Sequence, residues 1–112
     1  MIEEIVLKYL NDNASVECYT ERPETKPSSF LLIEKTGSSR TDQIDTATIA
    51  VQSYAPTLYK AAALNDEVKE LMFQLPYESN KVSAVRLNSD YNHTNTADKQ
   101  YRYQAIFVIT YF

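Results

Sequence analysis

The sequence predicts an α+β domain in which a mainly antiparallel sheet of four or five strands carries two helices on one face. Apolar residues recur at helical spacing in two segments, one near the start and one in the middle of the chain. Segments rich in β-branched and aromatic residues lie between and after them. With 112 residues, the chain is long enough for one domain with a single core.

The first predicted helix covers residues 2–10. Its apolar face consists of Ile2, Ile5, Val6, Tyr9 and Leu10. Glu3 and Glu4 lie in the first turn, where the helix dipole favours carboxylates. The polar residues 11–15 end this helix. Residues 16–20 are a candidate short strand, and residues 21–29 contain two prolines and no large apolar residue, which is typical of a connector.

Residues 30–54 predict a β-hairpin with a polar end. The continuously apolar stretch 30–33 is typical of a strand covered on both faces. In residues 44–54, Ala47, Ile49 and Val51 alternate with polar residues, which predicts a strand with one packed face. The connection 36–43, "TGSSRTDQ", is too long for a two-residue turn, so we expect it to form a loop that projects from the sheet.

The second predicted helix covers residues 55–75, with Pro56 opening it and Pro76 ending it. Its predicted apolar stripe consists of Ala61, Leu64, Val68, Leu71 and Met72. Residues 81–89 follow as a strand. Residues 90–100 have no aliphatic side chain larger than alanine and are predicted to form a polar loop. Residues 101–112 are predicted as the last strand, packed through Tyr103, Ala105, Phe107 and Ile109.

Charge and composition exclude several classes of protein. The formal charge of −4 and the absence of any cluster of Lys and Arg argue against a nucleic-acid-binding surface. The first residues have acids and no long apolar run, so we expect neither a signal peptide nor a membrane span, and a cytoplasmic site of synthesis. The single cysteine, Cys18, cannot form a disulfide within the chain.

No set of residues predicts an active site. His93 is the only histidine, whereas a metal site needs three or four ligands. A nucleophilic Cys18 would need that same histidine as its base, and nothing in the sequence links the two. Asp42 and Asp45 are spaced as turn-forming, solubilising acids. One glycine cannot build a glycine-rich phosphate loop. We therefore expect no enzyme, cofactor or metal site.

The two polar stretches, 36–43 and 90–100, are long for connections in a small domain. They are either ordinary surface loops or arms that become ordered against neighbouring subunits. On the second interpretation, the candidate interface residues are Thr36, Gly37, Arg40, Asp42, Asp90, Tyr91, His93 and Arg102. Composition alone leaves both interpretations open.

The whole layout resembles the tail-completion, or tail-terminator, proteins of long-tailed bacteriophages and prophages. The matching positions are Phe30, Glu34, Thr36, Gly37, Asp45, Ala47, Ile49, Tyr54, Ala61 to Ala63, Arg102 and Tyr103. The similarity covers nearly the whole chain, which implies a single tail-terminator-like domain at residues 1–112. The motif "TGSSR" departs from the pair of adjacent glycines that many relatives have at this point.

The resemblance implies a structural subunit that forms a six-membered ring on the head-proximal end of the tail tube. Such a ring stops tube polymerisation and joins the tail to the head. Its partners would be the tail tube protein and a neck or head-completion protein, with DNA passing through the bore without specific binding. The implied location is the tail–neck junction of the virion, after assembly in the host cytoplasm. The subunit could be monomeric until it meets the tube.

Two alternative classes remain open at this point. One is a head-closure or head–tail connector protein on the portal side of the neck. The other is a small host-directed inhibitor, or an enzyme whose site is not recognisable from sequence. The number of subunits in the assembly and the protein that co-purifies with it would distinguish these classes.

Overall fold

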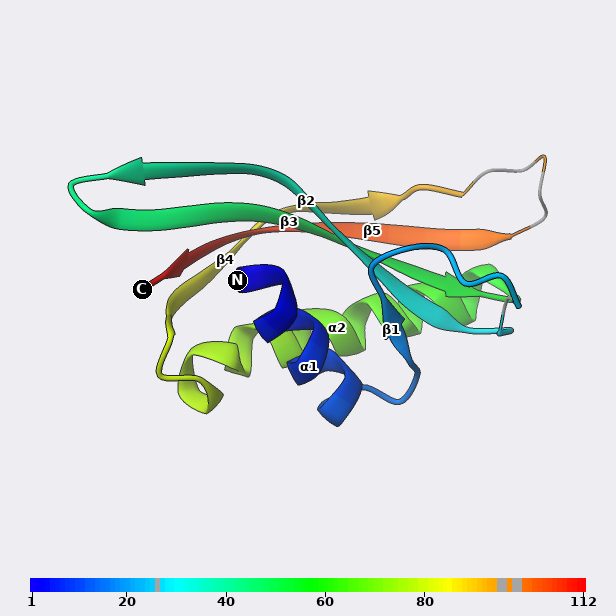
Figure 1. The fold of residues 1–112 in the computed structure, drawn as a ribbon. Coiled ribbons are helices and arrows are strands. Elements are labelled where there is room, and N and C mark those ends of the chain that lie inside the picture. Colours follow the sequence, from blue (N-terminus) through cyan, green and yellow to red (C-terminus); the bar gives the residue numbers. More distant parts are fainter. Residues whose placement is uncertain (26, 95–96, 98–99) are drawn as a thin grey trace.

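The computed structural model of the chain describes residues 1–25, 27–94, 97 and 100–112. Its elements are α1 (Ile2–Asn13), β1 (Cys18–Tyr19), β2 (Phe30–Thr41), β3 (Ile44–Ala55), α2 (Leu58–Glu78), β4 (Val82–Asn92) and β5 (Tyr101–Tyr111). The strands form one sheet in the order β1-β2-β3-β5-β4, in which the β1–β2 pair is parallel and the others are antiparallel. Both helices lie on the same side of this sheet (Figure 1). The predicted α+β class is confirmed.

The core fills the space between the helices and the facing side of the sheet. Along α2, the predicted residues Ala61, Leu64, Val68 and Met72 are buried, whereas Leu71 is only half-buried and Leu75 takes part instead. The sheet contributes Leu31, Ile33, Ala47, Ile49, Val51, Ala105, Phe107 and Ile109. Each large apolar side chain that becomes fully buried stabilises the fold by roughly 1.5–3 kcal/mol, so this layer accounts for most of the favourable burial.

A smaller aromatic cluster covers one end of the opposite side of the sheet. Phe30 and Tyr54 stack with ring centroids 4.5 Å apart and an interplanar angle of 8°, and Tyr19 meets Phe30 edge-on at 6.0 Å. The segment after β1 arches over this side of the sheet (Figure 1). Phe30 is therefore buried on the side away from the helices while Leu31 is buried in the core, as the apolar stretch 30–33 predicts.

The prediction of a loop at residues 36–43 is wrong. β2 and β3 are paired up to Thr41 and Ile44, and only Asp42 and Gln43 form the turn, with φ angles of 52° and 67°. Polar residues make a strand here because they have cross-strand partners in β3, and such pairs contribute more than intrinsic propensity. Gly37 lies inside β2, next to an irregularity in the ladder between Lys35 and Gly37, and has no positive φ.

Both predicted proline boundaries of α2 are also wrong. The helix begins at Leu58, and the hydroxyl of its N-cap Thr57 accepts a hydrogen bond from the amide of Lys60 at 3.1 Å, so Pro56 lies before the cap. Pro76 lies inside the helix, which continues to Glu78. A proline here removes only one hydrogen bond, and the last turn still closes through the Ser79 amide on the Leu75 carbonyl at 3.0 Å.

Two further boundaries differ from the prediction. α1 continues to Asn13, beyond the predicted end at residue 10. β4 continues to Asn92, so the first three residues of the predicted loop 90–100 belong to a strand. They are held there by partners far along the chain, because Tyr91 and Asn92 pair with Gln104 and Tyr103 of β5. Residues 95, 96, 98 and 99 of the predicted loop lie outside the described residues.

Candidate assembly surface

The eight predicted interface residues fall into two groups at opposite ends of the sheet. Thr36, Gly37, Arg40 and Asp42 belong to the β2–β3 hairpin, whereas Asp90, Tyr91, His93 and Arg102 lie toward the other end of the sheet, where β4 ends and β5 begins. Figure 1 shows these two ends of the sheet. Along the strands the nearest members, Gly37 in the row of Thr48 and Asp90 in the row of Val51, are about 10 Å apart, and they lie on strands at opposite edges of the sheet. The fold does not bring them together into one site.

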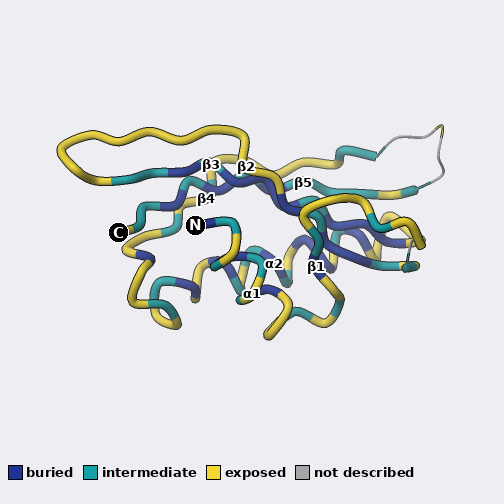
Figure 2. The backbone as a smooth tube through the Cα atoms, in the orientation of Figure 1, coloured by how far each residue is buried: buried dark blue, intermediate teal, exposed yellow. Residues whose placement is uncertain are grey.

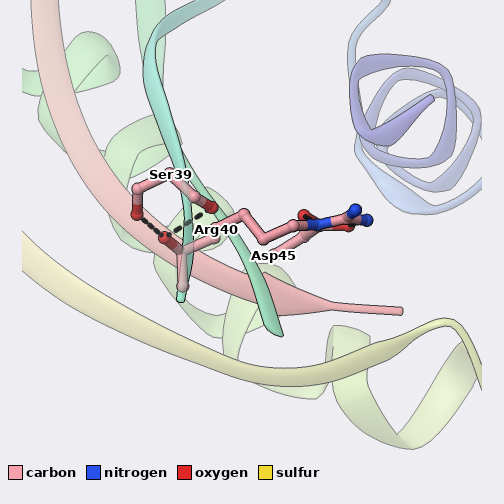
Figure 3. Close-up of polar contacts among 4 residues, drawn as sticks. Ser39, Arg40 and Asp45 are labelled. Carbon is pink, nitrogen blue, oxygen red and sulfur yellow. Dashed lines mark hydrogen bonds and ion pairs between the residues drawn. The ribbon is translucent and has the colours of Figure 1, made fainter. Parts of the chain in front are cut away.

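The hairpin end is organised by polar pairs across the two strands. Arg40 donates two hydrogen bonds to Asp45, from Nε at 2.7 Å and from Nη2 at 2.9 Å (Figure 3). This contact lowers the pKa of Asp45 and raises the pKa of Arg40. The hydroxyls of Ser39 and Thr46 lie 2.5 Å apart. These contacts hold the two strands together without any core beneath them.

The β2 strand of this end is exposed. Every residue of β2 from Glu34 to Thr41 is exposed, and the strand extends past the helices as a yellow tube, whereas β3 beside it is partly covered (Figure 2). Ile44, beside the turn, keeps 53% of its surface accessible. The projecting polar end expected from the sequence is therefore present, but as a paired hairpin and not as a loop.

Asp90 is used inside the chain's own fold. Its Oδ2 accepts hydrogen bonds from Asn65 Nδ2 and from Lys69 Nζ, both at 2.9 Å. The bond from Lys69 is the main reason why the pKa of Asp90 lies below its ordinary value, and it raises the pKa of Lys69. Asn65 is buried, so Asp90 fastens β4 to α2 and is not free to bind a partner.

A row of hydrogen bonds crosses the side of the sheet away from the helices. Arg102 Nη1 and Arg22 Nη2 donate to the Tyr54 hydroxyl at 2.9 and 3.2 Å. Tyr54 in turn donates to Gln52 Oε1 at 2.8 Å. Gln52 then donates to Gln104, and Gln104 donates to the Tyr91 hydroxyl, at 2.8 and 2.6 Å. Tyr91 and Arg102 are thereby linked through three strands.

Sequence reasoning named Tyr91 and Arg102 but missed the residues that join them. The signal was present: Gln52 and Tyr54 are two residues apart in one strand, as Arg102 and Gln104 are in another, so each pair shares a face. What the sequence could not show is that these two strands are neighbours in the sheet.

His93 and Cys18 have structural surroundings. The His93 amide donates to the Arg102 carbonyl at 2.9 Å, and the His93 ring lies edge-on to Tyr91 with centroids 5.6 Å apart. Cys18 is buried, which raises the pKa of its thiol to about 12. A thiol with this pKa is not a nucleophile at neutral pH. Within residues 1–25, 27–94, 97 and 100–112, no three His, Cys, Asp or Glu side chains are grouped to hold a metal ion.

The sheet has two open edges. β1 pairs only with Leu31 and Leu32, so in the described structure residues 34–41 of β2 pair on one side only, with β3. β4 is the last strand at the other edge and likewise has β5 as its single described neighbour. Unpaired backbone N–H and C=O groups along such edges are templates for pairing with another chain.

In the described part of the chain, no helix has the length and apolar character needed to cross a membrane.

Comparison with known proteins finds a structural similarity without a sequence match. No family model and no curated protein sequence matches the chain. A chain in the solved structure of the virion of a native gene transfer agent particle superposes with a TM-score of 0.72 and 10% sequence identity, covering 95% of this chain and 90% of that one. The two chains share a fold.

Proposed function

We propose that this protein is a structural virion protein that acts as a tail terminator. In this role it forms a ring on the head-proximal end of the tail tube, stops tube polymerisation and joins the tail to the head. The observation that carries the proposal is the similarity to a virion chain, which covers nearly all of both chains and so concerns the whole fold. The resemblance to tail-terminator proteins, which covers nearly the whole chain and includes Arg102 and Tyr103, supports the specific role.

The surface of the molecule suits assembly into a closed ring. A head-to-tail ring needs two different and complementary surfaces on each subunit. The unpaired edge of β2 and the unpaired edge of β4 are two such surfaces, at opposite edges of one sheet. We expect six copies in the ring, with the tail tube protein and a neck or head-completion protein as partners. A formal charge of −4 suits a bore through which DNA passes without binding.

The proposal is tested by electron microscopy of particles assembled without this protein. We expect tails longer than normal and heads without tails, because nothing would stop the tube or present a surface to the neck. Supplying the unsubstituted chain from a second gene copy should restore both tail length and joining. Tails of normal length attached to heads in its absence would contradict the proposal.

A co-purification experiment separates the tail terminator from a connector on the portal side. We expect the chain to be recovered with the tail tube protein from tails that were assembled without heads. Recovery with the portal from heads that lack tails would instead identify a head-closure or connector protein.

A further inference from the structure

We infer that each copy adds the β2 edge of its projecting hairpin to the β4 edge of the next copy, so that the sheets continue around the ring. This inference rests on the proposed ring and adds to it the surfaces through which the copies recognise one another. The paired segments are residues 37–40 of one copy and residues 82–86 of its neighbour.

The first support is that both open edges lie at the same height along the strands. The ladder passes from β2 through β3 and β5 to β4 in continuous rows of opposite residues. One row consists of Ser39, Thr46, Thr110 and Ala84, and another consists of Glu34, Ala50, Ile106 and Ser89. A rotation about an axis parallel to the strands therefore brings the β2 edge of one copy against the β4 edge of its neighbour. No shift along the strand direction is needed.

The second support is strand direction. Each of the three steps from β2 to β4 is antiparallel, so β2 and β4 run in opposite directions within one copy. A ring keeps all copies in the same orientation. The β2 edge of one copy is therefore antiparallel to the β4 edge of the next, which is the pairing with the more favourable hydrogen-bond geometry.

The third support is the chemistry of the facing side chains. In the unshifted arrangement, Gly37 is opposite Arg86, Ser38 is opposite Val85, and Ser39 is opposite Ala84. None of these pairs opposes like charges or two bulky groups. Neither segment contains proline, which would remove a ladder hydrogen bond.

Charges at the two edges are also complementary. Glu34 and Arg86 lie on the side of the sheet away from the helices, since they are opposite Ala50 and Val108, and both are exposed. Neither forms an ion pair with the described residues of its own chain. Across the inferred interface they are diagonal neighbours, two rows apart, at a distance that long side chains span.

Disulfide trapping tests this arrangement in the full-length chain. Ser39→Cys and Ala84→Cys are placed in separate copies, which are mixed, allowed to assemble on tail tubes and oxidised with diamide. We expect a covalent dimer only when both variants are present. A chain carrying both substitutions should give a ladder of covalent oligomers that ends at the closed ring. Buried Cys18 should stay unreacted.

The matched control replaces Ser39→Cys by Tyr59→Cys, at an exposed position at the start of α2, and we expect no dimer with Ala84→Cys. A dimer of Ala84→Cys alone would show two β4 edges pairing and would overturn the inference. Rings or normal tail ends without the mixed dimer would overturn it too, while leaving the proposed function intact. Failure of the unsubstituted chain to form rings or end tails would refute the proposed function itself.

A charge exchange gives a second, independent test. Glu34→Arg or Arg86→Glu alone should raise the concentration needed for ring formation roughly two- to fivefold, the range of one cross-strand pair. The double exchange should return it to the value of the parent chain. Single and double variants with equal effects would overturn the diagonal pairing and the unshifted register with it.

Discussion

At Asp90, one carboxylate oxygen accepts hydrogen bonds from a buried amide and from an ammonium group of the same helix. The sequence places this aspartate in a polar stretch that looks free to bind partners. In the fold it closes a contact between β4 and α2, in which its Oδ2 accepts the hydrogen bond of the buried Asn65 Nδ2 group. A residue of this kind acts on stability, and on assembly only through stability.

We predict that Asp90→Ala lowers the free energy of unfolding by about 1–3 kcal/mol, because it leaves the buried Asn65 amide without an acceptor. Chemical denaturation monitored by circular dichroism measures this change. Asp66→Asn is the matched control, since Asp66 forms an ion pair with the same lysine, at 3.3 Å, from an exposed position. Equal losses in the two variants would contradict the assignment.

The same contact predicts how stability depends on pH. The pKa of Asp90 is lowered from 3.8, so its contribution is present above pH 3.8 and is lost as the pH falls through the lowered value. The pKa of Lys69 is raised from 10.5, so its contribution is present below pH 10.5 and is lost as the pH rises further. We expect the difference between Asp90→Ala and the parent chain to be greatest between these values and to shrink outside them.

Cys18 allows a prediction about reactivity. Because its thiol is buried and its pKa is raised to about 12, we expect a thiol-specific reagent to modify it only as fast as the chain unfolds. Labelling in buffer and in denaturant measures the two rates. Rapid labelling of the folded chain would mean that β1 opens from β2 on its own.

At the scale of elements, the β2–β3 hairpin is a ribbon of polar residues that extends beyond the core. Its two-residue turn uses Asp42 and Gln43 in left-handed backbone conformations, which glycine adopts without cost and glutamine does not. The turn therefore keeps strain that the cross-strand pairs beside it offset. Arg40 with Asp45 and Ser39 with Thr46 are the pairs in question.

We predict that Gln43→Gly raises the free energy of unfolding by about 0.5–1 kcal/mol, because it removes the left-handed strain from one of the two turn residues. Thermal unfolding measures the shift. Gln74→Gly, at an exposed position inside α2, is the control and should lower stability by about 1 kcal/mol. A loss in both variants would mean that the turn is not formed as described.

At the scale of the whole molecule, the core and the projecting hairpin are separate. The principal extents are 45, 24 and 24 Å, and the exposed hairpin occupies one end of the long axis (Figure 2). The residues from Ser39 to Thr46 contribute nothing to the buried core cluster. Folding and assembly can therefore be altered independently.

We predict that replacing residues 39–46 by a two-residue Asn-Gly turn leaves a folded chain that unfolds cooperatively but no longer assembles. The physical reason is that the change removes ladder pairs and an open edge without exposing any core side chain. Cooperative unfolding is followed by circular dichroism and assembly by electron microscopy. Normal rings from the shortened chain would refute the role given to the hairpin.

Several features could be predicted from the sequence because they depend on local periodicity. Helical spacing in α2 identified Ala61, Val68 and Met72 as core residues, and alternation in β3 identified Ala47, Ile49 and Val51. Both patterns arise because one face of an element must leave water. The eight candidate interface residues rest on polar composition and on the family resemblance, and they stay a prediction.

Other features depend on how far neighbouring strands stay paired. Polar segments 36–41 and 90–92 are strands because Thr46, Asp45 and Gln104 lie opposite them across the two hairpins, and polar composition alone does not show that the ladders continue this far. The order of the strands in the sheet places Asp90 next to Asn65. It also decides which two sheet edges stay unpaired. The fold class and the core could thus be predicted from residue patterns, because hydrophobic burial determines those patterns. Hydrogen-bond pairing across the hairpins set the ends of the polar strands, and the order of the strands in the sheet set the open edges and the surface on which assembly is proposed to depend.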